Sequence, residues 1–170
     1  MSQLDLTLKT EMAPITAASM EQGAYERSYE HLVKLQILNE IHSAAEMLVF
    51  VDIRDLPPAE VVDDLAKTWR NRTTVAQYSP KFLEQVLKVR RCIMDVAAQR
   101  VPASSELHRA LNRSLSECWT LGAKVARKSG QSSKAYNLLL EAEKYSKEEL
   151  FLERAKLGCH SHSLLMGKKF

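Results

Sequence analysis

Three side chains near the end of the 170-residue chain have the types and spacing of metal ligands: Cys159, His160 and His162, in the run Cys-His-Ser-His. A cysteine thiolate and two imidazoles are ligands that Zn²⁺ prefers in proteins. A closed zinc site needs a fourth ligand and a fold that holds all four, whereas this run is short, polar and terminal. We therefore predict no metal-binding residue in this chain.

The other side chains with catalytic potential are isolated. His31 and His42 fall within one predicted helix, where surface or boundary positions explain them better than catalysis. The sequence contains no glycine-rich phosphate loop, no His-Arg-Asp or Asp-Phe-Gly motif, no Gly-x-Ser-x-Gly and no Cys-x-x-Cys. We expect no catalytic residue, no cofactor-binding residue and no cofactor in this chain, and we assign Trp69 and Trp119 to the core.

The composition favours long helices as the elements that position these side chains. Apolar residues make up 45% and charged residues 26%, while only five glycines and five prolines interrupt the chain. No run of about 18 uncharged apolar residues is present, so we expect no membrane span. The three cysteines (Cys92, Cys118 and Cys159) are odd in number and far apart, which favours free thiols in a reducing compartment.

Apolar residues recur every three or four positions along most of the chain, and nothing alternates with a period of two for long enough to predict a sheet. Proline, glycine and serine signals divide this pattern into helices. The predicted helices cover about 20–50, 58–71, 80–99, 105–128 and 132–145, with a loop or frayed end at 73–78 and a further helix opening at a capping box, 146–149. We expect Leu32, Leu35 and Leu38 on the apolar face of the first helix, and a left-handed Gly130 after the fourth.

Short connections between these helices predict antiparallel neighbours. Around Trp119 the pattern resembles a tetratricopeptide-type helix hairpin, whose repeat is about 34 residues long. Gly122 and Ala126 depart from the usual glycine and tyrosine of such a first helix. If Trp119 is its large residue, the turn and the small, large and small positions of the second helix are Gly130, Ala135, Leu139 and Ala142. The predicted fold class is all-α, with antiparallel helix pairs stacked as a TPR/HEAT-like α-solenoid.

The net charge of +3 conceals an uneven distribution. Residues 21–64 carry ten acidic and three basic residues, a net −7, whereas 86–134 carry three acidic and ten basic residues, a net +7. A basic segment is one mark of a nucleic-acid binder. These bases sit singly at helical spacing without interleaved aromatic residues, so we expect solvated helix faces and no direct nucleic-acid binding.

Several blocks of sequence carry a resemblance to a known family. Trp69-x-x-Arg72 is followed by Leu87-Lys-Val-Arg90-Arg91, and the most telling block, 117–130, reads Glu-Cys-Trp-Thr-Leu-Gly-Ala-Lys-Val-Ala-Arg-Lys-Ser-Gly. Further matching stretches are 29–35, 135–142 and 152–156. Together they cover residues 25 to about 156, which resemble the FAT region of the phosphatidylinositol 3-kinase-related protein kinases. Within that family the likeness is greatest to the checkpoint kinase of DNA damage and replication stress.

This resemblance implies a segment of a very large nuclear serine/threonine kinase. In that family the FAT helices form a helical-repeat clamp around the catalytic domain, so the expected partners are the rest of the solenoid and the kinase domain. The ATP site, with its divalent metal, belongs to that catalytic domain, so the resemblance transfers no functional residue to this chain.

The predicted organisation is a flexible N-terminal segment (1–19), a helical-repeat FAT-type segment (20–156) and an irregular C-terminal tail (157–170). The tail loses the amphipathic pattern, which favours a truncated gene model, a splice variant or a frameshifted end within a longer solenoid. Two alternatives remain: a free-standing helical-repeat adaptor that binds a partner peptide in a groove, and a nucleic-acid binder that uses the basic segment.

Overall fold

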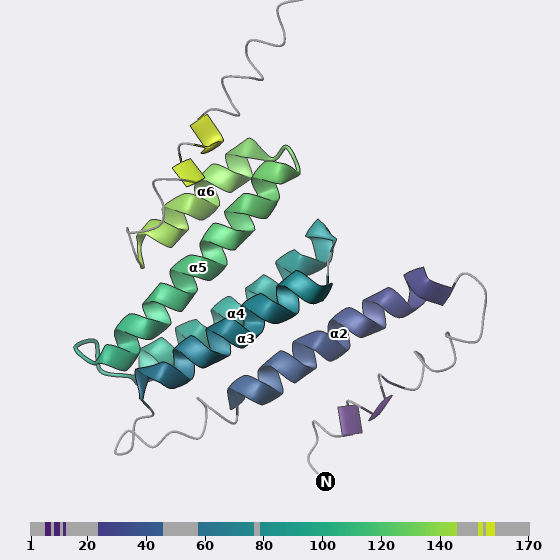
Figure 1. Cartoon of the computed structure of the whole chain (residues 1–170), viewed down its shortest axis with the longest axis horizontal. Coiled ribbons are helices and arrows are strands. Elements are labelled where there is room, and N and C mark those ends of the chain that lie inside the picture. The colour runs from purple at the N-terminus through teal and green to yellow at the C-terminus, as the bar shows by residue number, and fades with distance from the viewer. Residues whose placement is uncertain are drawn as a thin grey trace, which may run out of the picture. The chain divides into compact units, whose positions relative to one another are not determined.

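Five long helices account for most of the described chain (Figure 1). The computed structural model describes residues 6–7, 9–10, 12, 24–45, 58–76, 79–145, 153–154 and 156–158. The helices are α2 (Ala24–Ala44), α3 (Ala59–Ala76), α4 (Pro80–Arg100), α5 (Glu106–Lys128) and α6 (Ser132–Glu143). Across these ranges no residue is assigned to a strand, so the predicted all-α class is confirmed. No helix in the described part has the length and apolar character needed to cross a bilayer.

The chain divides into two compact units, residues 1–52 and 53–170. In the first unit α2 differs from its predicted pattern, because Leu32 is 43% exposed whereas its neighbour Val33 is buried. Apolar residues occur all around this helix in the run Leu-Val-Lys-Leu-Gln-Ile-Leu, so the spacing of the leucines does not select one buried face.

The second unit contains α3 to α6, with α5 packed against each of the other three helices. The predicted apolar stripes of α3 and α5 are confirmed, since Leu65 and Trp69 on α3 and Leu111 and Leu115 on α5 are all buried. The connections 101–105 and 129–131 are short, so α5 runs antiparallel to both α4 and α6.

Capping hydrogen bonds define where α5 begins and ends. At its start the Ser105 side chain caps the helix by accepting a hydrogen bond of 3.1 Å from the backbone N–H of His108. At its end Gly130 has φ +76°, as predicted, and donates to the carbonyl of Arg127, while Gln131 donates to the carbonyl of Ala126. This pair of bonds is a Schellman motif, which reverses the chain into α6.

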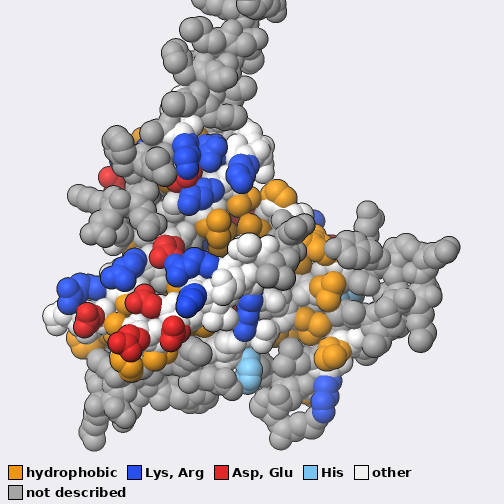
Figure 2. All heavy atoms as spheres, viewed as in Figure 1, with side chains coloured by type: hydrophobic (Ala, Val, Ile, Leu, Met, Phe, Trp, Pro, Cys, Tyr) orange, Lys and Arg blue, Asp and Glu red, His pale blue; other side chains and the backbone are white. Residues whose placement is uncertain are grey.

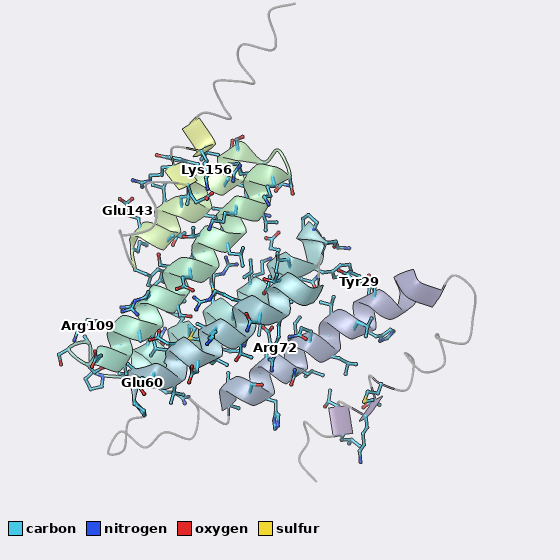
Figure 3. The ribbon with its side chains drawn as sticks, in the orientation of Figure 1. Tyr29, Glu60, Arg72, Arg109, Glu143 and Lys156 are labelled. Carbon is cyan, nitrogen blue, oxygen red and sulfur yellow. The ribbon has the colours of Figure 1, made fainter. Side chains whose placement is uncertain are left out.

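The starts of α3 and α5 lie at the same end of the second unit. Glu60 and Asp63 of α3 line one shallow hollow together with Glu106 and Leu107 of α5. The labelled Glu60 and Arg109 mark this end in Figure 3. The helices α3 and α5 therefore run parallel to one another. The helix α4, which lies between them in the sequence, runs antiparallel to α5.

Of the two alternatives for 73–78, a loop or a frayed helix end, the loop is wrong over the first four residues, because α3 continues to Ala76. The Thr73 and Thr74 hydroxyls donate to the carbonyls of Trp69 and Arg70 one turn earlier, at 2.8 and 3.0 Å, so both are satisfied within the helix. The helix α6 is shorter than predicted, since it ends at Glu143 and residues 144–145 form a turn. The capping box at 146–149 lies outside the described residues.

Candidate functional site

Two adjacent arginines of α4 connect it to the helices on either side. Neighbouring residues of a helix point about 100° apart, so Arg90 and Arg91 reach different partners. Arg90 is only 2% exposed, and its guanidinium lies 5.2 Å from the centre of the Trp69 ring. Its Nη1 also donates to Thr73 Oγ1 at 2.7 Å. We call this the Arg90–Trp69 pair, and it fixes α4 to α3.

The second arginine fixes α4 to α5. The Arg91 guanidinium lies 3.9 Å from the centre of the Trp119 ring, which is the closest of the cation–π contacts in the described residues. Gly122 lies beside this Arg91–Trp119 pair, and a Cβ atom there would be 3.6 Å from Arg91 Nη1. Burial lowers the pKa of Arg91, an effect that the charges of Cys118 and Glu84 oppose. A cation–π contact contributes about 0.5–2 kcal/mol, and most when it is desolvated.

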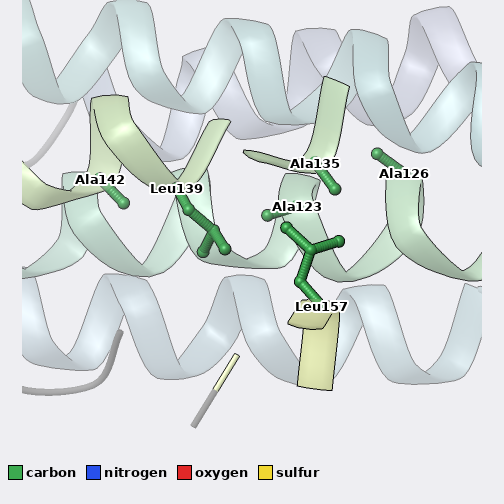
Figure 4. Close-up of a cluster of buried hydrophobic side chains, with 6 residues drawn as sticks. All are labelled: Ala123, Ala126, Ala135, Leu139, Ala142 and Leu157. Atoms are coloured by element: carbon green, nitrogen blue, oxygen red, sulfur yellow. The ribbon is translucent and has the colours of Figure 1, made fainter. Parts of the chain in front are cut away.

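The contact between α5 and α6 is built from small side chains instead. Figure 4 shows one cluster of buried side chains, to which α5, α6 and the segment after α6 all contribute: Ala123, Ala126, Ala135, Leu139, Ala142 and Leu157. The predicted small, large and small positions of α6 are therefore buried, as expected for a tetratricopeptide-type hairpin. The Ser116 hydroxyl donates to the Ala142 carbonyl at 3.2 Å, which adds a polar bond inside this contact.

The described residues after α6 return to the hairpin. Leu157, the first residue of the predicted irregular tail, is helical and 6% exposed. Glu153 bridges Arg127 of α5, at 3.4 Å, and Lys156, at 3.0 Å. Arg154 donates to Glu143, and Figure 3 shows Glu143 at the end of α6 and Lys156 beside that helix. The helical character of this chain therefore continues past residue 156.

The charge of Glu153 fits this position. Burial raises the pKa of Glu153, but the hydrogen bond from Lys156 and the charges of Lys124, Lys156 and Arg127 outweigh it, so the pKa lies below its ordinary value. The carboxylate stays ionised and holds the segment to α5 near neutral pH.

Most of the basic segment is already engaged. Six of the ten basic residues in 86–134 have an acidic or aromatic partner: Lys88, Arg90, Arg91, Arg113, Arg127 and Lys134. Figure 2 shows Lys and Arg side chains interleaved with Asp and Glu over the lower part of the described surface that it draws. Ion pairs and ring contacts therefore engage part of the basic segment.

A groove of about 490 Å³ lies where α4 begins and where α5 turns into α6. Arg91 and Gly122 line its inner part, and Lys134 of α6 and Glu84 of α4 form an ion pair of 2.7 Å at it. The hydrogen bond from Lys134, together with the charges of Lys134 and Lys88, lowers the pKa of Glu84 despite its partial burial.

The structure places the histidines and tryptophans singled out in the sequence as follows. His31 and His42 are half-buried on α2, Trp69 is buried, and Trp119 is partly buried beside the α5–α6 cluster. Cys159, His160 and His162 lie outside the described residues, and within the described part no three His, Cys, Asp or Glu side chains gather as metal ligands.

Sequence reasoning missed the roles of Arg90 and Arg91. A signal existed, because Arg90 continues the buried series of Leu83, Val86 and Leu87 at the expected three-residue spacing. An arginine inside an apolar stripe needs a buried partner, and the only two tryptophans of the chain are candidates for that partner.

Comparisons with known proteins identify the family of this chain. Residues 2–163 match the FAT domain. The chain is 26% identical to the serine/threonine-protein kinase ATR of Drosophila melanogaster over 144 residues, which is 84% of this chain and 6% of that kinase. It is 27% and 26% identical to the ATR kinases of Oryza sativa subsp. indica and Arabidopsis thaliana, over 85% and 86% of this chain and 5% of each kinase.

The chain thus spans only about one twentieth of the length of these curated relatives. No solved structure matches it. A match over residues 2–163 includes all five described helices, and on that basis the chain belongs to the FAT domain family.

Proposed function

We propose that this chain is a non-catalytic helical scaffold segment of an ATR-like serine/threonine protein kinase that acts in DNA-damage and replication checkpoint signalling in the nucleus. The observation that carries the proposal is the FAT domain match over 2–163, together with relatives that are all named as ATR kinases. Its partners are the rest of the kinase solenoid and the kinase domain. The helix pairs stack as a TPR/HEAT-like solenoid, with 20–156 as the repeat segment between an N-terminal segment (1–19) and a tail (157–170).

The packing of α3 to α6 supports a structural role. The Arg90–Trp69 and Arg91–Trp119 pairs brace α4 against α3 and α5, and the alanine-rich cluster joins α5 to α6. Each helix is thereby fixed to its neighbours by buried contacts, which is what a scaffold needs to hold a distant domain in place.

The first experiment asks on which polypeptide the sequence occurs. An antibody raised against the purified chain is used to probe lysates of the source cells and to immunoprecipitate the recognised protein. The proposal expects a polypeptide far larger than 19.3 kDa that phosphorylates serine or threonine in the presence of ATP and Mg²⁺. A recognised protein of about 19.3 kDa alone, without kinase activity, contradicts it.

The same precipitate tests the bracing role. Arg91→Ala in the full-length kinase is expected to lower kinase activity, while Arg113→Ala, which removes only a solvent-exposed ion pair with Asp63, leaves it unchanged. Equal activity of both variants and the wild type contradicts a structural role for the Arg91–Trp119 pair.

The groove beside Arg91 favours one alternative, a free-standing adaptor that binds a peptide. That alternative predicts a monodisperse 170-residue protein that unfolds cooperatively. It also predicts that Lys134→Glu releases the bound partner.

For either function we expect no measurable affinity for duplex DNA. Binding that weakens steeply with salt, as counterion release requires, contradicts this expectation.

A further inference from the structure

The groove beside Arg91 has apolar walls from three consecutive helices. Leu87 of α4, Val125 of α5 and Leu138 of α6 all contribute to its lining. Gly122 lies between two of them, since a Cβ atom there would be 3.7 Å from Leu138 Cδ1 and 3.9 Å from Leu87 Cδ1. At about 490 Å³ the groove has the size of sites that bury most of a small ligand, so it has room for several side chains of a partner.

The basic residues of this groove outnumber its acidic ones. The lining contains three basic residues and one acidic residue: Lys81, Arg91, Lys134 and Glu84. That acid is already engaged, because Glu84 accepts a hydrogen bond from Lys134 at 2.7 Å and also pairs with Lys88, at 3.7 Å. The charges of Lys81 and Arg91 are thus left without an ion-pair partner among the described residues.

Arg91 has donors available for an anion. Its side chain is half-buried, and the Trp119 ring covers the guanidinium at 3.9 Å. Its N–H groups donate no hydrogen bond to any other residue in the described part of the chain. A guanidinium stacked on a ring keeps its in-plane donors in a fork that matches the two oxygens of a carboxylate. Burial lowers the pKa of Arg91, and a bound carboxylate would offset this desolvation.

Lys81 adds a second charge near the start of α4. Its side chain is exposed, and its Nζ lies 5.6 Å from the centre of the Phe82 ring. An exposed lysine provides an attraction that salt screens, whereas the half-buried Arg91 provides a directed contact. No aromatic residue lines the groove, so it offers no ring on which a nucleic-acid base could stack. Apolar walls with two unpaired cations are therefore complementary to a ligand that combines carboxylates with apolar side chains.

We propose that the groove beside Arg91 is the docking site for an acidic peptide segment of a partner protein. One carboxylate binds the Arg91 guanidinium, a second lies near Lys81, and an apolar side chain packs between Leu87 and Leu138. This goes beyond the scaffold role and defines the chemistry of the peptide that the adaptor alternative leaves open. It needs only the packing of α4, α5 and α6, so it holds whether or not the chain is part of a kinase. The size of the polypeptide in the lysate tests the proposed function, and peptide binding tests this proposal.

The test measures peptide binding to the full 170-residue chain by isothermal titration calorimetry. The probe is the synthetic peptide acetyl-Asp-Leu-Glu-Leu-Asp-Leu-Glu-amide, and its control has Asn and Gln in place of every acid. We expect the acidic peptide to bind, with an affinity that falls as the salt concentration rises. The control peptide should bind at least about 10-fold more weakly, because it offers no carboxylate to Arg91.

Three variants locate the binding site. Arg91→Lys keeps the charge but loses the planar fork, so it should weaken binding of the acidic peptide about 10-fold. Lys81→Ala should weaken it about 2- to 5-fold. Lys67→Ala is the matched control, because Lys67 is also exposed but lies on α3 outside the groove, and it should leave the affinity unchanged. The two lysine variants alter only exposed side chains, so they test the groove even if Arg91→Lys disturbs the fold.

Several outcomes overturn the proposal. The first is that neither peptide binds, or that the acidic and control peptides bind equally. The second is that Lys81→Ala and Lys67→Ala weaken binding by the same factor. A single-stranded oligonucleotide of equal charge that binds as tightly as the peptide identifies a general polyanion surface instead. Self-association of the chain without peptide, measured by sedimentation and abolished by Arg91→Lys, identifies a second copy as the occupant.

Discussion

The helix α5 uses two different kinds of contact on its two sides. Against α6 it presents Ala123 and Ala126 to the alanines of the partner helix, with Leu139 and Leu157 as the large buried side chains of the cluster. On the side of α3 and α4 each tryptophan is covered by an arginine of α4: Arg91 covers Trp119 of α5, which also borders the α5–α6 cluster, and Arg90 covers Trp69 of α3. Small side chains let the first pair of helices approach closely, whereas bulky aromatic rings fill the space in the second.

This difference determines which substitutions each contact tolerates. A close-packed alanine contact has no room for a larger side chain, because the neighbouring backbone is already adjacent. A tryptophan–arginine contact loses a large buried surface when the ring is removed, and the guanidinium also loses the ring that covers it. The following predictions refer to the free energy of unfolding of the full chain, measured with urea.

The largest effect is expected on the aromatic side. Trp69→Ala should lower the free energy of unfolding by about 3–5 kcal/mol, since it empties a buried site and leaves Arg90 without its ring. Trp119 is only partly buried, so Trp119→Ala should cost less, about 1–3 kcal/mol. Equal losses at the two positions contradict the assignment of Trp69 as the more deeply anchored residue.

On the alanine side an enlarged side chain should destabilise. Ala142 is 0% exposed within the cluster, so Ala142→Leu should cost about 1–3 kcal/mol through overpacking. Leu140 lies on the same helix but is 38% exposed, and Leu140→Ala serves as the control, with a change of about 0.5 kcal/mol or less. If Ala142→Leu raises the free energy of unfolding, the contact between α5 and α6 has unfilled space and is not close-packed.

A substitution in the turn between α5 and α6 should lower the free energy of unfolding by a smaller amount. Gly130 has φ +76° with open space around it, so Gly130→Ala meets no atom but must hold a left-handed backbone, at about 1–2 kcal/mol. Gly122→Ala is the matched control, because that glycine is helical and an added methyl makes only ordinary contacts. If Gly122→Ala lowers the free energy of unfolding as much as Gly130→Ala does, the left-handed φ of Gly130 is not the cause of its loss.

The smallest effect concerns pH. The pKa of Glu153 is lowered in the folded chain, so its contribution to stability is present above about pH 4.5 and is lost as the pH falls through and below that value. Glu153→Gln should therefore cost about 1 kcal/mol or less at pH 7, and the difference from wild type should shrink by pH 3. A difference that is constant with pH would mean that the lost contact is packing rather than charge.

Much of the fold was predictable from local signals. Pro80 begins α4 and Gly130 terminates the α5 turn as predicted, because both signals act through the backbone of a few residues. The error at Thr73 and Thr74 arose because threonine is ambiguous in isolation, and its hydroxyl found acceptors only once the helix existed.

The site was less predictable, for a physical reason. The sequence by itself determined that the chain is helical, where most helices begin and end, and that Ala135, Leu139 and Ala142 share one face, since these follow from periodicity and caps. Only the tertiary structure decided which ring each arginine covers, because Arg90 and Arg91 are adjacent in sequence and their partners lie on different helices. Contacts between distant helices depend on how all of them pack, and local spacing does not encode that arrangement.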